Sequence, residues 1–231
     1  MNNVGFYCLT YKNKGLAAMK TMFSKMDINC VFYSGVEFTD RRLELALSDG
    51  LKRIWSTCYG HLDMIRLFYE SGKEYGIFCE DDIIIRNDFT QTLPDILADF
   101  DKLGLDILML GYLCENYIDG YCNFPTLLTR GPFKYLGYPS DLWGTQMYMI
   151  SRAQALRILS KYYYGYAEQT LKNSSLTPFS ADWTITKEGQ RALMFPLVAI
   201  ENFKEVYEDE HQMRSHTACY KFTYRPELFD L

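Results

Sequence analysis

A short apolar run in this chain ends directly in three acidic residues. Residues 75–82 read YGIFCEDD, an apolar stretch of strand length that ends in Glu80, Asp81 and Asp82. In open α/β sheets, ligands bind outside the carboxyl ends of the strands. Three adjacent carboxylates repel one another, and Mn²⁺ or Mg²⁺ offsets such charge in sites that also hold phosphate oxygens. The run therefore predicts a metal-bound nucleotide site, with an ordinary acidic loop as the alternative.

Strand-like and helix-like segments alternate along the chain. This alternation predicts an α/β fold with a mixed, mostly parallel sheet in a single domain, residues 1–231. We expect residues 1–110 to form the nucleotide- and metal-binding half and residues 111–231 the acceptor-side half. The expected strands are 4–9, 29–34, 75–80, 106–110, 144–150 and 192–195, and the expected helices are 14–26, 43–47, 55–71, 89–103, 152–162 and 181–188.

Punctuating residues set several of these boundaries. Gly50 is expected to stop the short helix at 43–47, and Ser56 or Thr57 to cap the helix that follows. Ser151 is expected to cap the helix at 152–162. Residues 111–141 and 162–176 are rich in Gly, Tyr or polar residues and are expected to be irregular, apart from a short strand near 134–138.

Charge and composition exclude several classes of partner. There are 24 Lys and Arg residues against 29 Asp and Glu, a net charge of −5, and no basic run. This balance argues against nucleic acid and anionic membranes as partners. The first residues do not resemble a signal peptide, and no stretch approaches the ~20 apolar residues of a transmembrane helix. The seven Cys form no CxxC pair, so we expect a reduced, cytoplasmic protein.

Several short motifs follow one another in a fixed order. His61 lies near the start of an expected helix, and Phe89 follows the last acid of the triplet by seven residues. Residues 142–151 read LWGTQMYMIS, and Asp182 follows much later. This ordered set resembles glycosyltransferase family 25, which holds bacterial lipopolysaccharide glycosyltransferases and procollagen hydroxylysine galactosyltransferases. The resemblance spans roughly residues 3–217. Thr57 and Gly60 depart from the family's pattern, as do residues 8–12, the region at 111–141 and Ser215-His216-Thr217.

The resemblance implies a GT-A-type, Rossmann-like domain, a UDP-sugar donor, Mn²⁺ and inversion at the anomeric carbon. The expected function is metal-dependent transfer of a hexose (galactose, glucose or N-acetylhexosamine) from a UDP-sugar to a glycan or protein acceptor. The alternative is a nucleotide-sugar-binding or nucleotidyltransferase-type protein that transfers no sugar.

Roles are expected for ten residues. Asp82 is the first candidate for a metal ligand, because a carboxylate just past a strand end can reach a diphosphate. An inverting transfer also needs a carboxylate that takes the acceptor's proton. The metal candidates are Asp82, Glu80 and His216; the candidate bases are Asp182 and, in reserve, Asp141; the candidate donor contacts are Thr10, Tyr11, Lys52, Glu80, Asp81 and Trp143.

Overall fold

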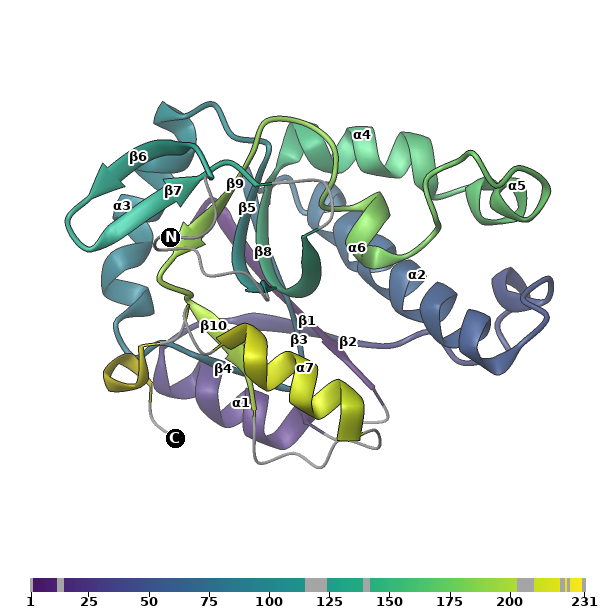
Figure 1. Cartoon of the computed structure of the whole chain (residues 1–231), viewed down its shortest axis with the longest axis horizontal. Helices are drawn as coiled ribbons and strands as arrows, with labels where there is room; N and C mark the ends of the chain where they lie inside the picture. The colour runs from purple at the N-terminus through teal and green to yellow at the C-terminus, as the bar shows by residue number, and fades with distance from the viewer. Residues whose placement is uncertain are drawn as a thin grey trace.

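The computed structural model of the chain is shown in Figure 1. It describes residues 2–11, 15–114, 124–138, 142–202, 210–220, 223 and 225–229, without the side chains of residues 143, 210–213 and 215. Among the described helices, none combines the length and the apolar character that a membrane crossing requires.

A twisted eight-stranded sheet forms the centre of the molecule. A second sheet of two strands, β4 (Ile83–Ile85) and β10 (Ala199–Glu201), lies beside it. The eight strands are, in spatial order, β2 (Cys30–Ser34), β1 (Val4–Thr10), β3 (Tyr75–Glu80), β8 (Trp143–Ser151), β5 (Ile107–Leu113), β9 (Arg191–Phe195), β7 (Phe133–Leu136) and β6 (Thr126–Arg130).

The large sheet is mixed and mostly parallel, as predicted. β8 and β7 run opposite to the other six strands. β8 comes from the second half of the chain and is inserted between β3 and β5 of the first half. The two predicted halves are therefore interleaved in one α/β domain, and the acid-bearing strand β3 pairs directly with β8.

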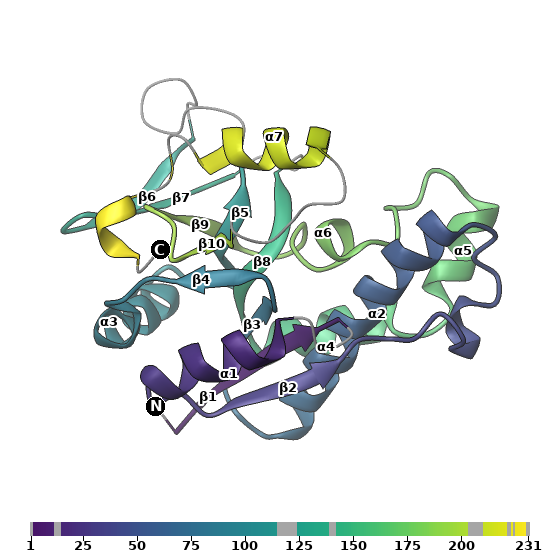
Figure 2. The same ribbon diagram turned by 90° about the horizontal axis from the view of Figure 1, so that it is seen from below.

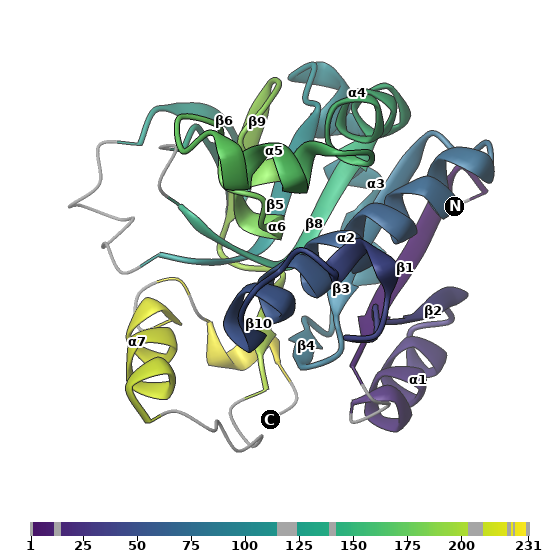
Figure 3. The ribbon, with the colours of Figure 1, turned by 90° about the vertical axis from the view of Figure 1, so that its right-hand side faces the viewer.

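Helices cover both faces of the sheet, and the alternation of side chains along each strand supplies two cores. On β1, Tyr7 and Leu9 face one core while Phe6 and Cys8 face the other. Figures 2 and 3 show α2 and α4 together on one side and α1 apart from them. The first core is covered by α2 (Asp49–Glu70), α4 (Arg152–Tyr162), α5 (Tyr166–Lys172) and α6 (Ala181–Thr184), and the second by α1 (Leu16–Lys25) and α3 (Phe89–Lys102).

Most strands and helices lie where the sequence predicts them. β1, α1 and β2 form the expected parallel βαβ unit at the start of the chain. The hydroxyl of Ser151 accepts a hydrogen bond from the backbone N–H of Gln154 and caps α4, as predicted.

The predicted start of the long helix is wrong. α2 begins at Asp49, where the Ser48 hydroxyl accepts from the Leu51 N–H, and Gly50 lies inside the first turn instead of ending a helix. The hydroxyls of Ser56 and Thr57 donate back to the Arg53 carbonyl within the helix, so neither residue is a cap. In place of the short helix expected at 43–47, the structure has a 3₁₀ turn, η1 (Arg41–Leu43).

The segments expected to be irregular contain regular structure. The hairpin of β6 and β7 occupies 126–136, where β7 confirms the short strand expected near 134–138 and β6 is a strand that the sequence does not predict. α5 interrupts the expected loop at 162–176. β10, α7 (Glu210–Tyr220) and η2 (Pro226–Leu228) lie in the tail, where the sequence predicts no element.

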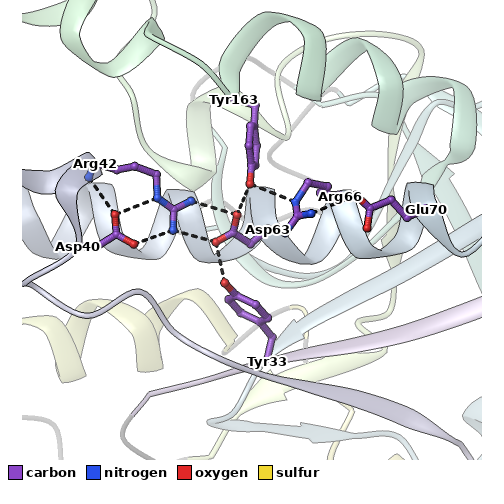
Figure 4. Close-up of polar contacts among 7 residues, drawn as sticks. All are labelled: Tyr33, Asp40, Arg42, Asp63, Arg66, Glu70 and Tyr163. Carbon is purple, nitrogen blue, oxygen red and sulfur yellow. Dashed lines mark hydrogen bonds and ion pairs between the residues drawn. The ribbon is translucent and has the colours of Figure 1, made fainter.

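A buried carboxylate joins η1, β2 and α4 to α2 (Figure 4). Asp63 is 3% exposed. Arg42 donates to both of its oxygens at 3.0 Å, the Tyr33 hydroxyl donates at 2.7 Å and the Tyr163 hydroxyl at 2.6 Å. The guanidinium of Arg42 also lies over the Tyr59 ring. Asp63 thus fixes the segment that follows β2 to the long helix.

We expect Asp63→Ala to lower the free energy of unfolding by about 2–4 kcal/mol, because two hydroxyls and a guanidinium lose their acceptor. Glu70→Ala is the matched control, since the exposed Arg66–Glu70 pair on the same helix should contribute only about 0.3–0.5 kcal/mol. Urea unfolding of the three proteins measures both losses. Equal losses in the two variants would contradict the assigned role of Asp63.

Candidate functional site

Three consecutive residues at the start of β8 each bind a different carboxylate. They bring together acids from the end of β3, from α6 and from the end of β10, which are far apart in sequence. The hydrogen bonds run from the Gly144 N–H to Asp182 Oδ1 (2.7 Å), from Thr145 Oγ1 to Glu80 Oε1 (2.9 Å) and from Gln146 Nε2 to Glu201 Oε1 (3.0 Å).

Gly144 has a backbone conformation that favours glycine. Its φ is +114°, and a Cβ there would lie 2.1 Å from Gln146 Oε1 and 3.0 Å from the Leu113 N. The absent side chain lets the Gln146 amide fold against the strand and reach Glu201. The glycine therefore supports two of the three carboxylate contacts.

We expect Gly144→Ala to destabilise the protein by about 1–3 kcal/mol more than Gly104→Ala. Gly104 also has a positive φ, of +59°, but a Cβ there meets nothing within 4 Å. Gly104 lies in the left-handed region that alanine enters at modest cost, whereas the φ of Gly144 lies outside that region and a Cβ there also collides with Gln146. Urea unfolding gives the two values, and equal losses would show that this close approach is unimportant.

Glu80 is held at one of its oxygens. Its Oε1 accepts from Thr145 and lies 3.4 Å from His61 Nε2, and the Glu80 side chain is 30% exposed. Burial opposes ionisation of Glu80, but the contact with His61 and the Thr145 hydroxyl outweigh burial and lower its pKa. Glu80 is thus a carboxylate kept ionised and held in one direction.

Asp82 has the opposite environment. Its Oδ1 is buried and has no hydrogen-bond partner. Burial, together with the charges of Glu80, Glu201 and Asp81, raises the pKa of Asp82 well above its ordinary value. A buried, unpartnered oxygen among like charges is costly, and a cation is what would offset that cost.

The proximity of Glu201 to Asp82 follows from the small sheet. β10 pairs antiparallel with β4, which places Glu201 opposite Ile83, and the Asn202 N–H donates to the Asp82 carbonyl at 2.6 Å. Glu201 is 6% exposed. Its Oε2 lies 2.8 Å from His216 Nδ1, which connects α7 to the site.

Asp81 contacts the connection between β1 and α1. Its Oδ2 accepts from the Tyr11 N–H at 3.1 Å and from the Gly15 N–H at 3.3 Å. A Cβ on Gly15 would lie 1.9 Å from the Asp81 carbonyl oxygen, so the backbone of Gly15 lies very close to the acid triplet. Burial raises the pKa of Asp81 despite these two donors.

Asp182 lies inside α6 and does not cap it. The residue at the N-cap position is Ser180, and the Oδ1 of Asp182 instead accepts from Gly144 across to β8. Burial raises the pKa of Asp182, the Gly144 N–H opposes that rise, and the charge of Glu80 adds to it. A carboxylate with a raised pKa is a stronger base once it is deprotonated.

The remaining predicted site residues are the other donor contacts and the reserve base. Thr10 is 2% exposed and donates to the Tyr33 carbonyl, whereas Tyr11, directly after β1, is 49% exposed. Lys52 lies within α2, not before a helix as expected. Trp143 is the first residue of β8, and the structure describes its backbone but not its side chain. Asp141 lies outside the described residues.

Across the described ranges, no group of three or more His, Cys, Asp and Glu side chains is arranged to hold a metal ion. The predicted ligands Asp82, Glu80 and His216 therefore do not form a ready-made metal site. Both Glu80 and His216 are paired with protein groups, whereas Asp82 has an unpartnered buried oxygen. The donors are all oxygen or imidazole, which suits Mn²⁺ or Mg²⁺.

Sequence reasoning missed two members of the group, Glu201 and Gln146. Gln146 lies inside the predicted motif at 142–151. It is two residues after Gly144, and residues two apart on a strand lie on the same face of the sheet, so the sequence could have placed it beside Gly144. No local signal marks Glu201, because its place depends on the pairing of β10 with β4.

Comparison with known proteins shows only distant similarity. No protein-family model and no curated protein sequence matches the chain. A glycosyltransferase involved in the glycosylation of the major capsid of PBCV-1 is 9% identical, with a TM-score of 0.38 over 82% of this chain and 81% of that one. A mannose-1-phosphate geranyltransferase from Thermus thermophilus is 10% identical, with a TM-score of 0.43 over 83% and 73%.

A UDP-glucose pyrophosphorylase complexed with UDP-glucose is 12% identical, with a TM-score of 0.38 over 68% of this chain and 79% of that one. Similarity at this level assigns neither a family nor an activity to this chain.

Proposed function

We propose that the protein is a metal-dependent, inverting glycosyltransferase that transfers a hexose from a UDP-sugar to a glycan or protein acceptor. The observation that carries this proposal is the environment of Asp82, whose buried and unpartnered oxygen lies among the charges of Glu80, Asp81 and Glu201. The motif resemblance to glycosyltransferase family 25 supports the choice of sugar transfer.

Asp82 is the proposed first ligand of Mn²⁺ or Mg²⁺. Glu80 and His216 are the other two proposed protein ligands. When bound, the cation would neutralise the diphosphate and stabilise the departing UDP. The protein's own acids repel a diphosphate, so we expect the donor to bind weakly in the absence of the cation.

The proposed transfer is a single displacement. The acceptor hydroxyl oxygen attacks the anomeric carbon, the bond from that carbon to the UDP oxygen breaks, and UDP leaves with the bonding electrons. Asp182 takes the proton of the acceptor hydroxyl as this occurs. The Gly144 N–H holds one oxygen of Asp182 at 2.7 Å, which limits the rotation of its carboxylate.

The experiment that tests this proposal is the release of UDP from a panel of UDP-sugars, with Mn²⁺ and with excess chelator. The proposal predicts UDP release, by transfer or by slow hydrolysis, that depends on the metal. Release of a sugar phosphate in the presence of pyrophosphate would instead show a nucleotidyltransferase. Absence of any turnover across the panel would show a binding protein.

We expect His216→Ala to weaken the apparent Mn²⁺ affinity of UDP-sugar turnover by about 10–100-fold. His216 Nδ1 faces the Glu201 carboxylate, an arrangement typical of an imidazole whose other nitrogen binds a metal. Titration of Mn²⁺ against UDP release measures the change. Unchanged metal dependence would remove His216 from the site.

A further inference from the structure

His61 is fully buried in α2 and both of its ring nitrogens contact protein groups. Nδ1 lies 3.0 Å from the Tyr148 hydroxyl and Nε2 lies 3.4 Å from Glu80 Oε1. The helix approaches the sheet closely here, since a Cβ on the preceding residue, Gly60, would lie 2.8 Å from Leu9 Cδ1. The side chain therefore reaches from α2 across to the carboxyl end of β3.

The Glu80 carboxylate defines which ring nitrogen donates to it. An ionised carboxylate can only accept, so Nε2 carries a proton, while Nδ1 and the Tyr148 hydroxyl form the second hydrogen bond of the ring. Tyr148 is itself fully buried, and its ring stacks on Phe78 with centroids 5.1 Å apart and planes 15° apart. β8 pairs Tyr148 with Phe78 in register, so the hydroxyl direction is fixed by the sheet.

The contact with His61 adds a second donor to the same oxygen of Glu80 that Thr145 binds. Two donors, from a helix and from a strand, determine the direction of a carboxylate better than one. Both donors bind the same oxygen of Glu80, so without them nothing in these contacts would hold the direction of its side chain.

We infer that His61 is a positioning residue that acts through Glu80: it fixes the carboxylate that faces the proposed reaction site, and Tyr148 holds the ring of His61 in place. The inference rests on the proposed function for its effect on sugar transfer, but not for the arrangement of the three side chains. His61 itself is buried away from substrate and is not assigned to the metal or to proton transfer.

A pair of variants separates this role from packing. The side-chain amide of Gln reaches as far as Nε2, so His61→Gln keeps a donor for Glu80. The amide of Asn reaches only as far as Nδ1, so His61→Asn keeps a partner for Tyr148 and loses the donor to Glu80. Both variants replace a buried ring with an amide and should destabilise the protein to a similar extent.

At saturating Mn²⁺, we expect His61→Asn to lower kcat for UDP-sugar turnover by about 10–100-fold, with little change in the KM of the donor, and His61→Gln to recover most of that loss. Equal losses of kcat in the two variants, or losses that follow their stabilities, would overturn the inference in favour of a packing role.

A second measurement needs no turnover. Long-range ¹H–¹⁵N spectra report ring tautomers, and the chain has only three histidines to assign. The wild type should show His61 as the Nε2–H tautomer, and Tyr148→Phe should keep that proton on Nε2, because the Glu80 carboxylate still accepts from it. An Nδ1–H tautomer in the wild type would overturn the inference. If the wild type turned over no UDP-sugar, the proposed function would fail and these spectra would still decide the arrangement.

Discussion

Asp82→Asn should lower metal-dependent UDP-sugar turnover by about 10²–10³-fold and at the same time make the metal-free protein more stable. The two effects have one cause. In the absence of a cation, Asp82 holds a buried, unpartnered oxygen beside other carboxylates, which raises its pKa and costs folding energy. An amide removes the charge and can donate to the neighbouring acids. We expect a gain of about 1–3 kcal/mol in the free energy of unfolding.

The sign of the pH dependence follows from the same shift. Since the pKa of Asp82 is raised in the folded state, the folded protein binds more protons than the unfolded chain above pH ~4. The stability of the metal-free wild type should therefore fall as pH rises from ~4 towards that raised pKa. The lowered pKa of Glu80 acts in the opposite sense, because its contribution is lost as pH falls. Asp82→Asn should make the fall with rising pH shallower.

Urea unfolding in chelator between pH 5 and pH 8 measures these slopes, with Asp95→Asn as the control. The Asp95 side chain is 61% exposed, so the control makes the same Asp-to-Asn replacement without touching the site. Mn²⁺ with UDP should raise the thermal midpoint of the wild type and not that of Asp82→Asn. If Asp82→Asn were inactive but no more stable than the wild type, the unpartnered oxygen of Asp82 would not cost folding energy in the metal-free protein.

The parts of the fold that can be predicted from the sequence are those set by local pattern. The acid-bearing strand, the opening βαβ unit and the Ser151 cap depend on residues within a few positions of one another. The predicted start of α2 is wrong because Gly50 resembles a stop, although glycine is tolerated in a first turn that Ser48 already caps. The order of strands cannot be derived locally, because β8 reaches its place between β3 and β5 only after a long excursion of the chain.

The candidate site divides in the same way. The acid triplet and Asp182 are recognisable as candidates from their motifs, and the structure brings Glu80 and Asp182 to adjacent residues of β8. What the sequence could not show is that Gly144, Thr145 and Gln146 each bind a different acid. Nor could it show Glu201, whose position depends on two strands more than a hundred residues apart. The burial of Asp82 and the approach of Glu201, both of which raise the pKa of Asp82, exist only once these segments meet.

Asp182→Asn should lower the rate of sugar transfer by about 10²–10⁴-fold and leave the affinity for the UDP-sugar close to that of the wild type. The amide oxygen of Asn can still accept from the Gly144 N–H, so the local structure should persist while the basicity is lost. Burial raises the pKa of Asp182, so transfer by the wild type should increase with pH through that raised pKa, and the variant should lack this rise. The residues proposed to bind the metal are unchanged, which is why donor binding should be retained.

The comparison requires two measurements on the same variant: donor affinity by calorimetry with Mn²⁺ present, and the transfer rate with an accepting sugar or peptide. Glu188→Gln is the control, because Glu188 is a carboxylate from the same region that pairs with Lys161 and Tyr162 away from β8, and its loss should affect stability without affecting transfer. A purely structural Asp182 would give a small stability change and a transfer rate within a few-fold of the wild type. That result would exclude Asp182 as the base and leave Asp141 as the candidate, whereas a loss of donor binding in parallel with transfer would place Asp182 among the donor contacts instead.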